Sequence, residues 1–108
     1  MATGRLGAVD LGSAATDTLL YTAPAGTFTV ASVSIVNRTN SDSTVRLGLC
    51  ASSSTIATGE FLEYETELLP HGVLERTGIV VNAGYSLLFR GSITGINAVV
   101  YGIETSTT

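Results

Sequence analysis

The feature that most restricts the fold is an alternation of apolar and polar residues with a period of two. In the segment TVRLGLC, Val45, Leu47 and Leu49 alternate with polar or small residues. This period is typical of strands with one buried face. About seven or eight such segments follow one another at spacings of about 8–12 residues, separated by Gly, Pro, Asn and Ser. The 108-residue chain is therefore predicted to be all-β, a small antiparallel β-sandwich or jelly-roll-like barrel of about 7–8 strands.

The segment EFLEYETELLPHG, residues 60–72, holds four of the nine acidic residues of the chain. Its alternation predicts a strand with the glutamates Glu63, Glu65 and Glu67 on one face and Leu62, Tyr64, Thr66 and Leu68 on the other. A helix is the alternative, because several of these residues also fall at helical spacing. The strand is favoured because Pro70 closes the segment and the chain has no other convincing helix to pack with.

Three uses of these glutamates are compatible with a strand. A charged outer face discourages edge-to-edge aggregation of sheets. The same face could instead contact a basic partner surface, or hold a divalent cation, although calcium prefers six to eight oxygens that converge from a loop. Catalysis is excluded, because glycosidase carboxylate pairs come from different parts of a deep cleft and one of them has a pKa raised by burial.

The segment TFTVASVSIVN carries apolar residues in both phases of a strand. Phe28 and Val30 are in one phase, whereas Val33 and Ile35 are in the other. Two explanations remain open: a β-bulge near Ala31–Ser32, or a strand that is buried on both faces.

The charge content indicates that another chain covers part of the surface. Charged residues make up 13% of the sequence, lysine is absent, and the five positive charges are all arginine. Such a surface leaves apolar patches unbroken, which is uncommon for a free monomer. The net charge of −4 argues against nucleic acid, which requires a basic face. No apolar run approaches the roughly 20 residues that span a bilayer, so we expect no membrane partner.

The residues that usually perform chemistry are scarce, so the chain is predicted not to be an enzyme. His71 is the only histidine and is expected to be exposed in the turn PHG, while Cys50 is the only cysteine and is expected to be a small buried hydrophobe. No serine lies in a G-x-S-x-G motif. We expect no metal and no cofactor. The segment ASSSTIATG is predicted to be a loop with one apolar anchor, Ile56. The N-terminus lacks the apolar stretch of a signal peptide, which favours assembly in the cytoplasm.

An ordered series of short motifs runs through the chain: YTAPAG, IVNR, EYE, GVLERTGIVVNAG and the terminal VYGIE. Their order and spacing, from about Gly4 to Glu104, resemble those of small virion structural proteins of tailed bacteriophages, notably cyanophages. The resemblance implies a non-enzymatic β-protein present in many copies in the virion. It is compatible with capsid decoration and with a tail, baseplate or fibre component, including one that binds the host.

Three features favour a capsid decoration protein, which binds across capsid subunits and stabilises the head. The chain is short and has no heptads or repeats for a fibre shaft, it has the low charge of a surface buried by neighbours, and its N-terminal segment is suited to reach onto another subunit. The expected partners are further copies of the chain, as a homo-oligomer, and the major capsid protein; the resemblance implies a trimer.

The N-terminal segment is glycine-rich and apolar enough to act as an arm reaching onto another subunit. We therefore divide the chain into an arm (residues 1–12), a β-sandwich (13–104) and a polar tail (105–108). Arg76 interrupts an apolar run and is expected to pair with Glu75 or with an acidic neighbouring chain. The candidate partner-binding residues are Arg5, Leu6, Glu63, Glu65, Glu67 and Arg76.

Overall fold

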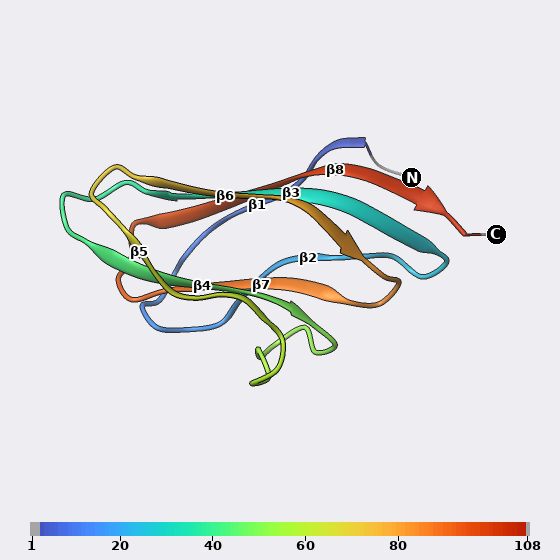
Figure 1. Cartoon of the computed structure of the whole chain (residues 1–108), viewed down its shortest axis with the longest axis horizontal. Helices are drawn as coiled ribbons and strands as arrows, with labels where there is room; N and C mark the ends of the chain where they lie inside the picture. The colour runs from blue at the N-terminus through green and yellow to red at the C-terminus, as the bar shows by residue number, and fades with distance from the viewer. Residues whose placement is uncertain (1–2, 108) are drawn as a thin grey trace.

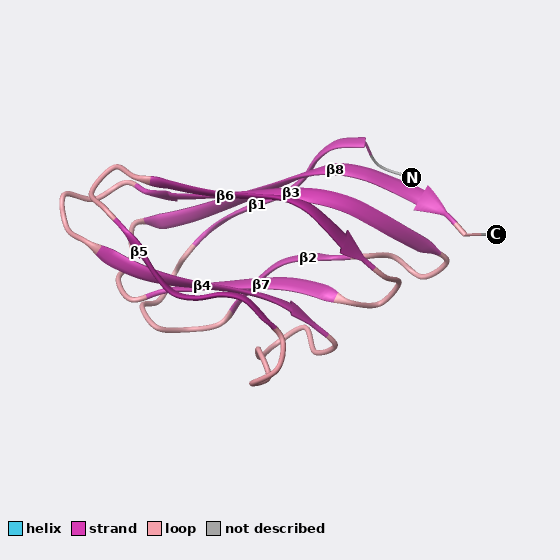
Figure 2. Ribbon diagram, in the orientation of Figure 1, coloured by secondary structure: helices cyan, strands magenta, loops and turns pink. Residues whose placement is uncertain are grey.

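A computed structural model describes residues 3–107 of the chain, which form eight strands and no helix (Figures 1 and 2). The strands are β1 (Thr3–Asp10), β2 (Thr18–Thr22), β3 (Thr27–Asn37), β4 (Ser43–Cys50), β5 (Phe61–Leu68), β6 (Val73–Val81), β7 (Ser86–Gly91) and β8 (Ile96–Ser106). They build two four-stranded sheets, sheet A in the order β1-β8-β3-β6 and sheet B in the order β2-β7-β4-β5. Figure 1 shows the two sheets as stacked layers. The predicted all-β sandwich is confirmed.

The strand order follows from one long antiparallel hairpin that is folded over on itself. The hairpin turns between β4 and β5, and its paired strands are β4 with β5, β3 with β6, β2 with β7 and β1 with β8. Where the hairpin folds over on itself, two further pairs of strands form, β3 with β8 and β4 with β7. The result is the eight-stranded, two-sheet arrangement of a jelly roll.

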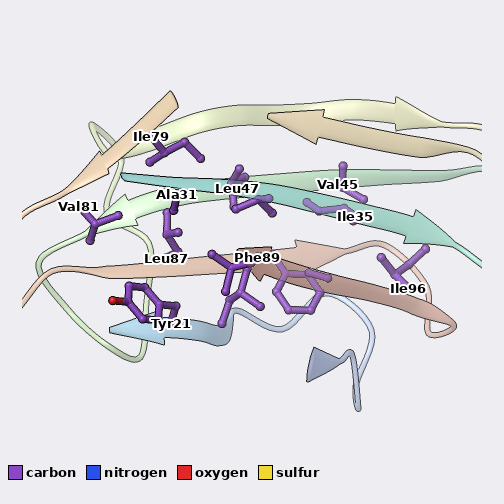
Figure 3. Close-up of a cluster of buried hydrophobic side chains, with 14 of the residues drawn as sticks. Tyr21, Ala31, Ile35, Val45, Leu47, Ile79, Val81, Leu87, Phe89 and Ile96 are labelled. Atoms are coloured by element: carbon purple, nitrogen blue, oxygen red, sulfur yellow. The ribbon is translucent and has the colours of Figure 1, made fainter. Parts of the chain in front are cut away.

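The core lies between the sheets and is built from the inward residues of both (Figure 3). Phe89, Leu47 and Ile35 are the largest of the fully buried side chains that contribute to it from β7, β4 and β3. In β4 the alternation holds as the sequence predicts, because Val45 and Leu47 are fully buried. Removal of these apolar side chains from water supplies most of the stability of such a sandwich.

Tyr21, Thr29 and Glu104 form a buried polar group within the sandwich. The hydroxyl of Tyr21 donates a hydrogen bond to Oε2 of Glu104 at 2.6 Å and lies 2.7 Å from Oγ1 of Thr29. Burial, followed by the bond to Glu104, raises the pKa of the Tyr21 hydroxyl to about 12. The three residues come from β2, β3 and β8, so this group joins the two sheets near the chain termini.

Strand β3 has no bulge of its own. Its register with β8 is continuous, while the shift against β6 between Ala31 and Val33 places the extra residue on β6, beside Gly78 with its φ of +70°. A register shift thus lies near Ala31–Ser32, where the sequence suggests a bulge, but its extra residue belongs to β6 and not to β3. Phe28 and Val30 simply point outward and are exposed.

The ends of the chain belong to the sandwich. Residues 3–10 of the expected arm pair with β8 as an edge strand, and Leu11 is part of the core. At the other end, β8 runs to Ser106, and the backbone N–H of Thr107 donates to the carbonyl of Gly26. The sandwich therefore spans residues 3–107, not 13–104; the rest of the expected arm and tail, residues 1–2 and 108, lies outside the described residues.

Candidate interaction surfaces

The outer face of sheet A carries a continuous group of exposed apolar side chains. We call this group the apolar face; it consists of Phe28, Val30, Val80, Tyr101 and Ile103. Val80 and Ile103 are exposed to 57% and 55%, which is high for aliphatic residues of a strand.

The strand register makes the apolar face contiguous. Val30 on β3 lies directly opposite Val80 on β6 and directly opposite Ile103 on β8. Such cross-strand neighbours have Cβ atoms about 4.5–5.5 Å apart. Three aliphatic side chains therefore form an unbroken row across three strands, and a surface of this kind marks an interaction site more often than isolated exposed residues do.

Two charged residues flank the apolar face on opposite edges of the sheet. Arg5 on β1 lies opposite Tyr101 in the register, and within residues 3–107 the structure records no ion pair for it. Glu75 on β6 accepts a hydrogen bond from the Tyr101 hydroxyl at 2.9 Å, and this bond raises the pKa of Tyr101. Strands β8 and β3 separate Arg5 from Glu75 within the chain.

The outer face of sheet B, in contrast, is covered in part by the chain itself. The loop over residues 51–60 folds back so that Ile56 packs on Gly48 and Cys50, and Cys50 and Leu88 are fully buried. A Cβ atom on Gly48 would lie 2.6 Å from Cγ2 of Ile56, so glycine is what admits this anchor. Ile56 therefore acts as the apolar anchor predicted from the sequence.

Two carboxylates hold the same loop in place. Glu60 accepts hydrogen bonds from the backbone N–H groups of Ala51 and Ala57, and Asp17 accepts one from the N–H of Ile56. These backbone bonds lower the pKa of Glu60. The loop is thus held in a defined position over part of sheet B. Within residues 3–107 no loop covers the apolar face of sheet A in this way.

Arg46 forms an aromatic cluster beside this loop. Its guanidinium carbon lies 4.5 Å from the ring centre of Tyr64 and 5.8 Å from that of Phe61, and its Nε donates to Glu65 at 3.1 Å. The cluster lines a surface hollow of about 540 Å³. Because Glu65 already pairs with Arg46, the hollow offers an aromatic surface more than a free positive charge.

The three glutamates of β5 do not share a face, and the predicted alternation is wrong here. Glu65 has a φ of +52°, and the pairing of β5 with β4 shifts between Val45 and Leu47. This bulge leaves Glu63 opposite the inward-facing Leu47 but turns Glu65 outward to Arg46. Tyr64, expected on the face of Leu68, is exposed to 59%. A bulge and charged side chains on an edge strand protect it from pairing with other sheets.

Glu63 forms an ion pair with Arg76 that joins the two sheets. Arg76 lies on β6, the edge of sheet A, and its Nη1 donates to Oε2 of Glu63 and to the carbonyl of Leu62, the latter at 3.0 Å. Thr66 completes the contact by donating to the other oxygen of Glu63. The expected pairing of Arg76 with Glu75 is therefore wrong.

We expect the Arg76–Glu63 pair to contribute a coupling energy of about 1 kcal/mol to the free energy of unfolding. Both side chains are partly exposed, at 41% and 21%, so solvent weakens the attraction. Urea unfolding of Arg76→Ala, Glu63→Ala and the double variant measures this coupling. A coupling of zero would show that the pair does not stabilise the fold.

The other candidate residues lie on β1. Leu6 is the extra residue of a bulge between Arg5 and Gly7 and packs partly against the core, whereas Arg5 remains exposed. The sequence reading missed the apolar face, although its signal was present: apolar residues in both phases of Phe28–Ile35.

The groups with catalytic potential lie apart. Cys50 is buried at one end of β4, and burial, followed by the charge of Glu60, raises its thiol pKa to about 11. His71 is exposed in the turn after β5, whose last residue, Leu68, pairs with the opposite end of β4. In residues 3–107 no three His, Cys, Asp or Glu side chains are grouped to hold a metal ion.

No helix that could cross a lipid bilayer forms in residues 3–107. Comparisons of the chain with protein-family models, with curated proteins and with solved structures found no match.

Proposed function

We propose that the chain is a non-enzymatic structural protein of a tailed-phage virion, most specifically a capsid decoration protein that stabilises the head. The observation that carries the assembly role is the difference between the two sheets. Sheet B is covered in part by its own loop over residues 51–60, although Leu19 and Tyr64 stay exposed, whereas the apolar face of sheet A has no such cover in the single chain. Such a surface is stabilised when another protein covers it.

The fold suits a mechanical role. Antiparallel ladders and a shared core hold eight strands in one unit, and the Arg76–Glu63 ion pair joins the two sheets at their edge. A rigid unit can transmit load between the subunits that it touches. Contacts that bury on the order of 1,000 Å² or more hold partners stably enough to resist the pressure of packaged DNA. The resemblance to small virion proteins supports a phage virion as the assembly, and the short chain without heptads and the low charge favour the head over the tail.

A tail, baseplate or fibre component is the second candidate, and the cluster around Arg46 favours it. Tyr64 is 59% exposed next to Phe61, and their rings meet edge to face with centres 4.8 Å apart. Exposed aromatic rings beside a hollow can stack on sugars of a host surface. In this version the loop over residues 51–60 and its neighbours contact the host.

A cryo-EM comparison of virions with and without the gene for this chain tests the proposal. We expect difference density at many symmetry-related points on the head. Difference density confined to the tail would replace the decoration role with the second candidate. If virions assembled with the gene present contain none of this protein, both roles are overturned.

A further inference from the structure

We infer that the apolar face is a homotypic interface, in which two copies of the chain pack sheet A against sheet A about a two-fold axis parallel to the strands. This inference rests on the proposed assembly role, because it specifies which protein covers the apolar face. Its test uses the purified chain alone, so that its failure can be told apart from failure of the virion role.

The first argument is the pattern of apolar residues on β3 and β8. The inward side chains of these strands, such as Val33 and Val100, already fill the core. Val30 and Ile103 add apolar side chains on the opposite face, where the folded chain gives them no cover. Strands with apolar residues on both faces are typical of sheets that are covered on both sides.

The size and shape of the face suit a second sheet. Four strands about 4.8 Å apart and about seven residues long present roughly 19 by 24 Å, before the relief of the side chains is counted. A stable interface buries about 800 Å² on each partner, so the flat area of this face is a little more than half of what is needed, and the relief of the side chains adds to it. Two sheets with β-branched residues on the facing sides pack about 10 Å apart with strands nearly aligned.

The charges on this face are complementary to those of a second copy. A two-fold axis parallel to the strands places β1 of one copy over β6 of the other, because it reverses the order of the strands. Arg5 then faces the partner's Glu75, and the same contact occurs a second time. Within one copy, Arg5 lies level with Ser32 of β3, and Glu75 lies level with Ser34. Arg5 and the partner's Glu75 are therefore offset by two residues, roughly 7 Å, along the strands. An arginine side chain is long enough to span this offset.

Two copies of a chain with a net negative charge repel each other, but the charges on the outer side of sheet A cancel locally. The chain carries −4, but on the outer side of sheet A Arg5 offsets Glu75, and Asp10 forms an ion pair with Arg38. Two other exposed acidic residues without a recorded ion pair in residues 3–107, Glu67 and Asp42, lie away from this face, on β5 and before β4. A second copy therefore meets an apolar, locally neutral surface.

Sedimentation equilibrium on the purified full chain, from about 1 µM to about 1 mM, tests the inference. We expect a monomer–dimer equilibrium that Ile103→Glu weakens by at least about tenfold, because it buries a charge in the interface. Leu69→Glu is the matched control: Leu69 is as exposed, at 57%, but lies in the turn after β5, and its substitution should leave the equilibrium unchanged. Thermal unfolding of both variants verifies that each still folds.

A charge exchange tests the two-fold arrangement itself. Arg5→Glu and Glu75→Arg are each expected to weaken the dimer, and the double variant is expected to restore most of the loss. The two-fold dimer takes the place of the trimer that the resemblance implies. A monomer at every concentration, that trimer, or a dimer insensitive to Ile103→Glu would overturn the inference. If the monomer nevertheless binds capsid shells and decorates virions, the proposed function stands and only the partner of the apolar face changes.

Discussion

Replacement of Asn37 by alanine is expected to lower the free energy of unfolding by about 3–4 kcal/mol, a large fraction of the stability of a domain this size. Asn37 ends β3 and is fully buried. Its Nδ2 donates to the carbonyl of Ser41 at 2.8 Å and to those of Leu68 and Leu69, both at 3.2 Å. Its Oδ1 accepts from the backbone N–H and the hydroxyl of Thr39.

These bonds make Asn37 the common anchor of two connections. One is the loop from β3 to β4 and the other is the turn from β5 to β6, both at the same end of the sandwich. Alanine removes every one of these bonds and leaves a cavity, while carbonyl groups near it lose their donor. Each lost bond costs about 0.5–1.5 kcal/mol, and an unsatisfied buried group costs more.

Urea unfolding monitored by circular dichroism measures the effect as a shift in midpoint at constant slope. Asn40→Ala is the control, because Asn40 lies exposed in the same loop, and its effect should stay within about 0.5 kcal/mol. A loss below about 1 kcal/mol for Asn37→Ala would mean that water replaces the amide without cost, and that Asn37 is not an anchor.

Deletion of residues 1–12 is expected to abolish cooperative folding. It removes strand β1 with its ladder to β8, the core residue Leu11, and the partly buried Leu6 and Val9. Full burial of one leucine alone contributes about 1.5–3 kcal/mol, and the ladder and two further apolar contacts add to it. The sum is comparable with the whole stability of a small domain.

Circular dichroism and amide NMR spectra of the truncated chain check this expectation. Leu11→Ala serves as a graded comparison, with an expected loss of about 2–4 kcal/mol and a retained cooperative transition. A truncated chain with a dispersed spectrum and a sharp unfolding transition would contradict the structure and restore the interpretation of residues 1–12 as a detachable arm.

Several elements were predictable because their signal is local. Alternation in Val45–Leu49 marks a strand wherever the strand lies, and Gly, Pro and Asn mark turns through their backbone preferences. The same holds for the loop over residues 51–60, whose single apolar residue, Ile56, had to pack somewhere. Cys50 is buried as predicted, because a lone small thiol behaves as a hydrophobe.

The errors on β5 and β3 have different causes. The bulge at Glu65 shifts the register by one residue, which is enough to send Glu63 toward Arg76 and Glu65 toward Arg46. No residue type in EYETEL, such as a glycine, predicts this shift in the register of β5 against β4. On β3, Phe28 and Val30 carry the signature of burial, and a sequence does not distinguish burial by the chain's own core from burial by a partner.

The sequence by itself determined the class of the fold, since strand periodicity is a property of each segment's own backbone and turn residues. It also determined the shortage of charge and of catalytic groups. Only the tertiary structure decided which face of each strand meets the core, that residues 3–10 are an edge strand, and that sheet A keeps its apolar side open. These features depend on pairing between segments far apart in the chain, such as β1 with β8, and one residue of register at such a pairing inverts the faces of a strand.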